Sequence, residues 1–340
     1  MTIKVGFFLF FPPTLWVRGG GEVQLAKTKE ALERFGVHVS LFDIWSSDSE
    51  FDLIHVFGSN YEVASFVKSA KERMPVVVST IAYSSKPGWQ WMVWKHINRC
   101  VPVETIYRLR QRIYEYADRL IVASRAEAKQ LARNFHINAQ KVRVVPHGVD
   151  VARFKTVKPD MFINRFGIQD FVLQVGRINR HKGQVRLIRA LEGTGLQAVF
   201  IGPLDTGDPD EVAKFKALVD RHHWVHYLGA VSHDDPLLAS AYAAARVCAL
   251  PSISESFGLT VLEAIAAGTP VVCGVYPPIR EYFGDSIYYC NPGSIESIQR
   301  NVLRAYEQGL KAGVREHVLN NFSWDQVGQR LLEIYKELVA

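Results

Sequence analysis

Two glutamates eight residues apart, Glu255 and Glu263, are the residues of this sequence best suited to binding or catalysis. They flank Gly258 and follow a short apolar segment, Val247–Leu250, which predicts a buried strand. Carboxylates accept paired hydrogen bonds from vicinal hydroxyls, so the pair suits a sugar on one side and a ribose on the other. The sequence therefore predicts a site for a hydroxyl-rich ligand at the end of this strand.

The residues between the glutamates predict an anion site. Gly258 would let the backbone approach a ligand, and Leu259–Ala267 predicts a helix that Gly268 and Pro270 end. The free N–H groups at the start of a helix bind anions. The alternative is an ordinary helix with an acidic residue near its N-terminus, which the helix dipole favours.

A basic loop, Gly176–Gly183, follows another expected strand. Arg177 offers a planar fork for phosphate oxygens, and Lys182 offers a mobile point charge. Together they could neutralise a leaving diphosphate without a metal ion. The alternative is a solvated loop with no ligand.

The glycines Gly19, Gly20 and Gly21 precede a helical segment and form a second possible anion cradle, or simply a flexible loop. They do not fit the G-x-G-x-x-G spacing, so a dinucleotide-binding fingerprint is not supported.

Strands and helices alternate along the chain, which predicts parallel sheets covered by helices on both faces. In the first half we expect strands at residues 3–11, 37–42, 52–58, 76–78 and 120–122, with a helix at 22–35. In the second half we expect strands at 171–175, 198–201, 224–227 and 247–250, with helices at 184–191, 210–221, 237–245 and 325–338. The fold class is α/β, with two doubly wound Rossmann-like domains facing a cleft. We expect domains at residues 1–155 and 156–324, followed by a C-terminal helix, 325–340.

The order of these segments resembles that of the retaining glycosyltransferases of family 4, which have the glycosyltransferase-B fold. The resemblance spans nearly the whole chain, and the basic loop and the glutamate pair are its most specific parts. Its other parts are Gly19–Glu22, Asp52 with His55, and Val145–Asp150. The resemblance implies transfer of a sugar from a nucleotide-diphosphate sugar to a glycan or lipid-linked acceptor, without a metal or other cofactor.

The resemblance also assigns roles by matched position. Arg177 and Lys182 would hold the diphosphate, and Glu255 would hold the donor sugar; these three are the expected catalytic residues. Glu263 would bind the ribose. The other expected donor-binding residues are Gly20, Gly21, Phe257, Gly258, Leu259 and Thr260. The terminal helix would dock on the first domain.

Two stretches depart from the family pattern. The family often has a histidine after its fourth strand, near the reacting sugar, but Val78–Tyr83 contains none. Ile201–Leu204 lacks a second glycine that is often present after that strand. These departures leave open which residue replaces the histidine and how the base is bound.

Composition and charge limit the function classes. The chain is 48% hydrophobic and 22% charged, which excludes a disordered protein, and its four scattered cysteines predict a reduced, cytoplasmic one. The longest opening apolar run, Val5–Phe11, is too short for a membrane span and lacks a cleavage site. Residues 1–155 hold 22 Lys and Arg against 14 Asp and Glu, a net charge of +8, whereas the remainder has −2.

Three tryptophans, Trp89, Trp91 and Trp94, lie among cationic residues in this basic half. Such a mixture is typical of a surface that rests on an anionic membrane, and equally of a helix that buries its tryptophans in the first domain. We find no nucleic-acid recognition module.

The histidines allow two interpretations. His222, His223, His226 and His233 could form a metal cluster, but they fall on a helix end, a strand and a loop, which favours structural or surface roles. His55 ends an apolar segment and is either a core histidine or a cleft residue.

The chain is thus interpreted as a retaining glycosyltransferase. The alternatives are a glycan phosphorylase of related fold and a catalytically silent nucleotide-sugar-binding or scaffold protein. The donor sugar, the base, the acceptor and the oligomeric state are not determined by the sequence.

Overall fold

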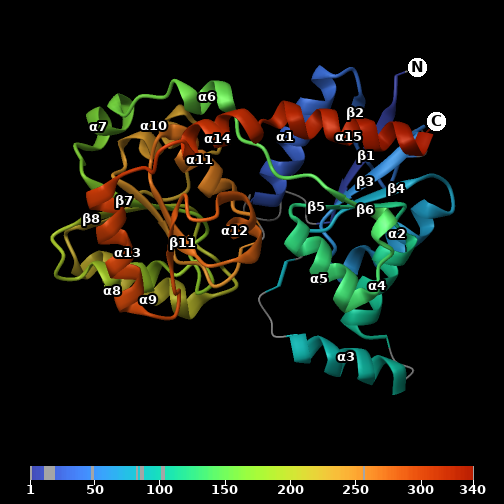
Figure 1. The fold of residues 1–340 in the computed structure, drawn as a ribbon, viewed down its shortest axis with the longest axis horizontal. Coiled ribbons are helices and arrows are strands. Elements are labelled where there is room, and N and C mark those ends of the chain that lie inside the picture. The colour runs from blue at the N-terminus through green and yellow to red at the C-terminus, as the bar shows by residue number, and fades with distance from the viewer. Residues whose placement is uncertain are drawn as a thin grey trace. The chain divides into compact units, whose positions relative to one another are not determined.

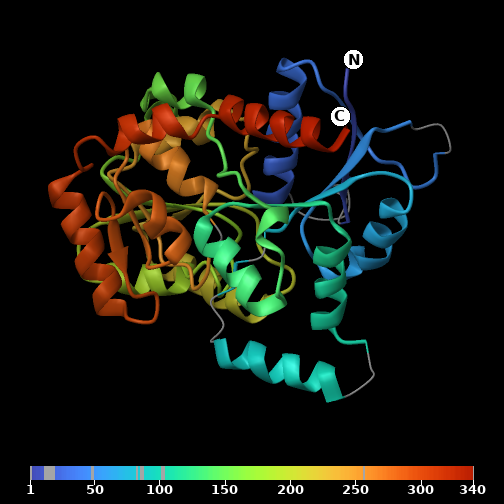
Figure 2. The same cartoon turned by 45° about the vertical axis from the view of Figure 1, so that its right-hand side comes forward.

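The computed structural model describes residues 2–10, 20–46, 50–81, 83–84, 88–100, 104–255 and 257–339. The chain forms two compact units, which Figures 1 and 2 show from two directions. Unit 1 consists of Met1–His147 and Trp324–Ala340, and unit 2 of Gly148–Ser323.

Unit 1 contains a parallel sheet with helices on both faces. Its strands are β1 (Lys4–Leu9), β2 (His38–Leu41), β3 (Leu53–Phe57), β4 (Val76–Ser79), β5 (Arg119–Val122) and β6 (Val142–Val144). Its α-helices are α1 (Gly20–Arg34), α2 (Ala64–Lys71), α3 (Gly88–Cys100), α4 (Ile106–Tyr116), α5 (Arg125–Phe135) and α15 (Trp324–Val339), and two short 3-10 helices are Tyr61–Val63 and Ala139–Lys141.

Unit 2 has the same construction. Its strands are β7 (Phe171–Val175), β8 (Gln197–Ile201), β9 (Val225–Tyr227), β10 (Val247–Leu250), β11 (Val271–Gly274) and β12 (Tyr288–Cys290). Its helices are α6 (Val151–Lys155), α7 (Asp160–Phe166), α8 (Gln184–Leu191), α9 (Pro209–Arg221), α10 (Pro236–Ala244), α11 (Leu259–Ala267), α12 (Pro277–Phe283), α13 (Ile295–Gln308) and α14 (Val314–Asn321).

Within the described residues, each sheet has six strands that pair in parallel. The order is β2-β1-β3-β4-β5-β6 in unit 1 and β12-β11-β10-β7-β8-β9 in unit 2. The chain order reverses beside the first strand of each sheet, as in doubly wound folds, and ligands bind at the carboxyl edge of such sheets. The strands expected from the sequence are confirmed, β7 and β10 with the expected ends and the others with shifted ends. Phe11, the expected end of the first strand, lies outside the described residues. Strands β6, β11 and β12 are additional.

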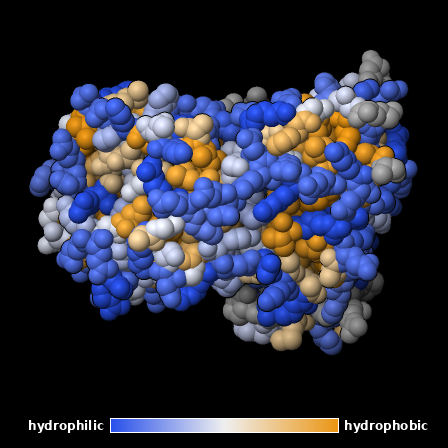
Figure 3. Space-filling model, turned by 45° about the horizontal axis from the view of Figure 1, so that its top comes forward, coloured by the Kyte–Doolittle hydropathy of each residue, from blue (hydrophilic) through white to orange (hydrophobic). Residues whose placement is uncertain are grey.

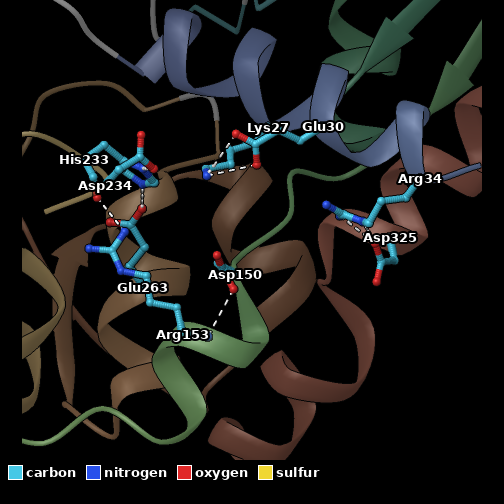
Figure 4. Close-up of polar contacts among 9 residues, drawn as sticks. All are labelled: Lys27, Glu30, Arg34, Asp150, Arg153, His233, Asp234, Glu263 and Asp325. Atoms are coloured by element: carbon cyan, nitrogen blue, oxygen red, sulfur yellow. Dashed lines mark hydrogen bonds and ion pairs between the residues drawn. The ribbon is translucent and has the colours of Figure 1, made fainter. Parts of the chain in front are cut away.

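Helix α15 packs against α1 in unit 1. A Cβ on Gly328 would lie 3.1 Å from the backbone and side chain of Ala31, so a larger residue would push the two helices apart. Arg34 at the end of α1 forms an ion pair with Asp325, at 2.6 Å (Figure 4). The expected docking of the terminal helix on the first domain thus corresponds to a packed α1–α15 interface.

His55 of β3 lies under α15 and is fully buried. Its Nδ1 is 2.6 Å from the hydroxyl of Tyr335, and its Nε2 is 2.9 Å from Oγ of Ser79. Burial lowers the pKa of His55 to about 3. Of the two interpretations of this residue, the core histidine is the one that the structure supports.

The division between the units falls after His147, whereas the sequence predicts it after Lys155. Helix α6 belongs to unit 2 because Arg153 donates to the carbonyl oxygens of His233 (2.5 Å) and Asp235 (2.7 Å). Both are contacts of a side chain with backbone far along the chain, which no local pattern predicts.

The surface is mostly polar, with separate apolar groups, on the face drawn in Figure 3. Scattered exposed apolar side chains are normal for a folded protein. No helix of the described residues has the length and the apolar character that crossing a bilayer requires.

Candidate active site

The carboxyl edge of the unit 2 sheet brings backbone segments close together at two glycines. The amide of Gly176, directly after β7, donates to the carbonyl of Ile201 at the end of β8 (2.9 Å). A Cβ on Gly202 would lie 2.1 Å from the carbonyl oxygen of Gly176, so no other residue fits there. These glycines allow the loops after β7 and β8 to start side by side.

The basic loop after β7 is held in place by side chains from its two ends. Gln174 donates to the carbonyl of Lys182 (2.7 Å), and Gln184 donates to the carbonyl of Arg177 (3.0 Å). Inside the loop, Asn179 accepts from the Lys182 amide (3.0 Å). The loop therefore has one defined backbone conformation, unlike a freely solvated loop.

The loop after β10 lies against the basic loop. The amide of Ile253 donates to the carbonyl of His181 (2.7 Å). Gly183 has a φ of +76°, and a Cβ there would lie 2.7 Å from the Pro251 carbonyl oxygen. This close approach requires glycine and joins two segments about 70 residues apart in sequence.

Lys182 and Glu255 meet at this contact. Lys182 Nζ is 2.5 Å from Glu255 Oε1, with side-chain exposures of 31% and 12%. An ammonium and a carboxylate so placed can contact a phosphate oxygen and a hydroxyl of one ligand. The structure thus brings two of the three predicted catalytic residues together.

Arg177, the third, is half-buried at the start of the same loop. Its charge acts on Asp205 after β8. Burial raises the pKa of Asp205, but hydrogen bonds from Asn179 and from the Gly207 amide and the charge of Arg177 outweigh it, so this pKa is lowered. The guanidinium thus belongs to the same cluster of polar groups at the strand ends.

Helix α11 begins as expected after Gly258, which has a φ of +80° and makes no side-chain cap. The first N–H groups of the helix, at Leu259 and Thr260, therefore meet no capping side chain at that position. Phe257 is fully buried and packs on Tyr282, with ring centroids 5.0 Å apart. The buried ring anchors the turn that starts the helix.

Glu263 lies one turn into α11 and is buried, with 6% exposed. His233 Nε2 is 2.6 Å from its Oε1 (Figure 4), and the Tyr242 hydroxyl donates to its Oε2 (2.8 Å). Burial lowers the pKa of His233, but the hydrogen bond and charge of Glu263 outweigh it, and the pKa is raised. Burial and then Glu263 raise the pKa of Tyr242 well above its usual value. The raised pKa of each group favours its protonated form, which donates to the Glu263 carboxylate.

The remaining predicted donor-binding residues, Gly20 and Gly21, form the first turn of α1 in unit 1. A Cβ on either would meet no described atom within 4 Å. Gly19 lies outside the described residues. The role of these glycines stays a prediction.

The four histidines considered as a metal cluster have different neighbours. His226 contacts Gln197 (3.1 Å), His222 lies 3.4 Å from Glu192, and His233 binds Glu263. Among the described residues, no group of three metal-ligating side chains is found. His233 and Tyr242 are the site residues that the sequence did not reveal, because nothing in their spacing connects them to Glu263.

In unit 1, the stretch after β4 that lacks a histidine has an unusual backbone. Ile81 has a φ of +44°, which is rare for a β-branched residue, and 37% of it is exposed. The preceding Thr80 is buried and donates to the fully buried Glu127 (2.6 Å), while its carbonyl accepts from Ser59 (2.8 Å). These hydrogen bonds fix the backbone on which Ile81 stands.

The three tryptophans fall on α3, which lies on the outside of unit 1, beyond α4 and α5 (Figures 1 and 2). Trp91 packs on Phe135 and Tyr107, with ring centroids 5.6 and 6.3 Å apart. Trp89 and Trp94 are 59% and 49% exposed. The interpretation that all three are buried is therefore wrong for two of them.

Family models match most of the chain. Residues 160–318 match the family described as glycosyl transferases group 1, and residues 43–153 match glycosyltransferase family 4. A D-inositol 3-phosphate glycosyltransferase of Salinispora arenicola is 31% identical over 260 residues, 68% of this chain and 57% of that protein. An uncharacterized glycosyltransferase of Methanocaldococcus jannaschii is 31% identical over 241 residues, 64% of this chain and 59% of that protein. The chain thus spans little more than half the length of these curated relatives.

Solved structures share the fold along the whole chain. A sucrose-phosphate synthase from Thermosynechococcus elongatus has a TM-score of 0.80 at 21% identity, covering 99% of both chains. HepE of Anabaena, in complex with UDP-glucose, has a TM-score of 0.78 at 19% identity, covering 99% of this chain and 100% of that one. The expected class of two doubly wound Rossmann-like domains is confirmed.

Proposed function

We propose, since the chain belongs to the group 1 and family 4 glycosyltransferases, that it transfers a sugar from a nucleotide-diphosphate sugar to a glycan or lipid-linked acceptor with retention of configuration. The observation that carries the proposal is the Lys182–Glu255 contact of 2.5 Å next to the start of α11. A cation, a carboxylate and free N–H groups are the groups that a sugar diphosphate needs. The Anabaena structure with UDP-glucose supports a nucleotide sugar as donor.

In this proposal the reaction breaks the bond between the anomeric carbon and the diphosphate oxygen. The charge that develops on the diphosphate is stabilised by Arg177, Lys182 and the N–H groups of Leu259 and Thr260. No metal ion is needed, because the cations and the helix start replace its charge. The acceptor hydroxyl attacks from the side of the leaving group and passes its proton to a diphosphate oxygen, so that the configuration is retained.

The two glutamates divide the donor between them. Glu255, which contacts Lys182, receives hydroxyls of the donor sugar, and Glu263 receives the ribose diol. The backbone of Phe257 and Gly258 lies between these two contacts along the chain. Gly20 and Gly21 are proposed to bind the donor as well.

A thermal-shift panel of nucleotide sugars tests this function. A ligand at 100 times its dissociation constant should stabilise the protein by about 2.7 kcal/mol. The same panel on Lys182→Met should show a reduced shift, and on Lys216→Met, a change of an exposed lysine of α9, an unchanged one. Absence of any shift with the wild type would contradict the proposal.

Two rival functions are distinguished by the products. Phosphate-dependent release of a sugar phosphate from a glycan would indicate a phosphorylase. Binding of a nucleotide sugar without transfer or hydrolysis would indicate a catalytically silent protein. Release of the nucleoside diphosphate from its sugar conjugate supports the transferase.

We further propose that α3 rests on an anionic membrane when the acceptor is lipid-linked. Trp89, Met92 and Trp94 are 59%, 66% and 49% exposed, and the helix carries Lys95 and Arg99 but no acidic residue. Exposed aromatics with cations suit a bilayer interface. The free cysteines support a reducing, cytoplasmic setting for this contact.

Vesicle sedimentation tests the membrane contact. Binding to vesicles with phosphatidylglycerol should weaken with salt and drop in Trp89→Ala/Trp94→Ala, and remain in Trp45→Ala, which removes a tryptophan 89% exposed elsewhere in unit 1. Equal loss in both variants, or no binding of the wild type at low salt, would refute it.

A further inference from the structure

Glu263 is held by two donors that contact different oxygens of its carboxylate. His233 binds Oε1 at 2.6 Å, and Tyr242 binds Oε2 at 2.8 Å. An ionised carboxylate oxygen has about two acceptor positions, so each oxygen keeps one. Two contacts of this kind fix the plane of the carboxylate and leave a matched pair of acceptors, which is what two adjacent hydroxyls require.

His233 is itself fixed by α6. Arg153 donates through Nη1 to the carbonyl of His233 and through Nη2 to that of Asp235, at 2.5 and 2.7 Å. The amide of Arg153 is in turn capped by Asp150 (3.1 Å; Figure 4). The loop between β9 and α10 is therefore attached to the first helix of unit 2, and the imidazole has little freedom to leave Glu263.

Tyr242 is equally constrained from the other side. It is fully buried, and its carbonyl accepts from the Thr269 hydroxyl (2.5 Å). Phe154 packs edge-on against its ring, with centroids 5.9 Å apart. Either group buried alone would be unfavourable, because it would lack a hydrogen-bond partner. The hydrogen bond between the buried phenol and the buried carboxylate therefore fixes the orientation of both groups.

We propose that His233 is a positioning residue that, with Tyr242, orients the Glu263 carboxylate for a ribose diol and takes up a proton when a nucleoside diphosphate binds. The inference rests on the proposed function, because it requires the ribose of the donor at Glu263. It adds His233 and Tyr242 to the residues of that function, and it couples the binding of a nucleoside diphosphate to protonation of His233.

The charges around His233 give the sign of the linkage. Glu263 faces the ring from α11, Asp234 lies 3.6 Å from Nδ1 on the same loop, and Arg153 faces it from α6. Burial and Arg153 lower the pKa of His233, but the two carboxylates raise it by more, so the net shift is upward. A bound diphosphate adds negative charge and raises this pKa again. The complex therefore holds more protons than the free protein, and affinity falls as the pH rises through these values.

Calorimetry of the whole chain tests the inference with uridine, guanosine and adenosine diphosphates, their 2′-deoxy counterparts and inorganic pyrophosphate. His233→Asn and Tyr242→Phe should each weaken the bound nucleoside diphosphate about tenfold, within the range of couplings between contacting residues. They should also reduce the preference for ribose over deoxyribose and leave pyrophosphate binding unchanged. His223→Asn, at an exposed histidine of the same unit, is the matched control and should have no effect.

Two further measurements separate positioning from a structural role. Binding enthalpies in buffers of different ionisation enthalpy, between about pH 6 and pH 9, should show proton uptake by the wild type and by His223→Asn but not by His233→Asn. In a Glu263→Gln background, His233→Asn should cause no additional loss of ribose preference.

The outcomes are distinguishable. If the folded His233→Asn and Tyr242→Phe variants keep both the affinity and the ribose preference, the inference is overturned while the proposed function stands. If the wild type binds none of the nucleoside diphosphates, the proposed function fails and the inference fails with it.

Discussion

The buried His55 makes the stability of unit 1 depend on pH, and the size of the effect follows from its environment. Burial lowers its pKa from 6.5 to about 3 in the folded state. Above pH 6.5 the ring is neutral in both states and contributes no pH dependence. Below 6.5 the unfolded chain binds a proton that the folded chain does not, so stability is lost as the pH falls toward 3.

The loss expected at pH 5 is about 2 kcal/mol, because the unfolded pKa lies about 1.5 units above that pH and each unit corresponds to about 1.4 kcal/mol. His147, with a pKa lowered by burial to about 4, adds a second loss in the same direction. Replacing His55 removes only its own share. His55→Gln should therefore lose about 2 kcal/mol less than the wild type between pH 7.5 and pH 5, whatever its stability at pH 7.5.

Urea unfolding followed by tryptophan fluorescence measures this difference. Six of the seven tryptophans lie in the segments that form unit 1, so the signal reports chiefly on that unit. His38→Gln, at an exposed position of β2, is the control and should keep the wild-type pH dependence. If His55→Gln and the wild type lose the same stability over this interval, the assignment of His55 as a neutral buried ring is refuted.

Three other outcomes are expected. Arg177→Ala and Lys182→Ala should each lower turnover by about 10²-fold, the scale for losing one charge-stabilising group, and wild-type activity should survive EDTA. Normal turnover in both variants, or a strict need for added divalent cation, would refute the leaving-group assignment. Glu255→Gln should impair transfer and sugar selection while leaving affinity for the free nucleoside diphosphate intact, whereas Glu263→Gln should weaken donor and diphosphate alike; calorimetry that finds unchanged diphosphate affinity for Glu263→Gln would contradict the ribose role. Ile81→Gly should stabilise the protein by about 1 kcal/mol, because the relief of about 1–3 kcal/mol of backbone strain exceeds the extra conformational entropy that glycine loses on folding. Ile44→Gly, at an exposed isoleucine without positive φ, should destabilise it. Equal destabilisation of the two variants in urea would show that Ile81 is not strained.

Local patterns predicted the elements that carry the site. Helix α8 spans the predicted residues 184–191, because its apolar spacing is regular and Gly183 marks its start. Helix α11 likewise spans the predicted 259–267, between Gly258 and Gly268. The sequence does not predict β6, β11 and β12, of three or four residues each, because such short segments show little period of their own. Strand β9, which has three residues, is predicted only as part of the longer apolar segment 224–227.

Contacts between distant segments were less accessible to sequence reasoning. The meeting of Lys182 and Glu255 depends on Gly183 passing close to the Pro251 carbonyl, a fit that appears only when β7 and β10 pair. The sequence favours a structural or surface role for His233, because the four histidines considered together fall on a helix end, a strand and a loop. Its partner Glu263 lies 30 residues away, and the packing of α10 and α6 on α11, with the contact of Arg153 with the His233 carbonyl, brings the two together.

The pairing of the two ends of unit 2 has a consequence for how the polypeptide matures on the ribosome. Val149 and Ser323 form a β-bridge, and the Val149 amide donates to the Phe322 carbonyl (2.7 Å). The first and last residues of the segment 148–323 therefore lie side by side. Because these ends are adjacent, the inserted unit 2 adds little loop-closure entropy to the folding of unit 1. Unit 2 can also fold by itself as it leaves the ribosome. Unit 1 cannot be completed then, because the ring of His55 must wait for Tyr335, 280 residues later. The nascent chain would therefore carry a finished unit 2 beside an open sheet, and the α1 surface that awaits α15 is where a chaperone would be expected to act.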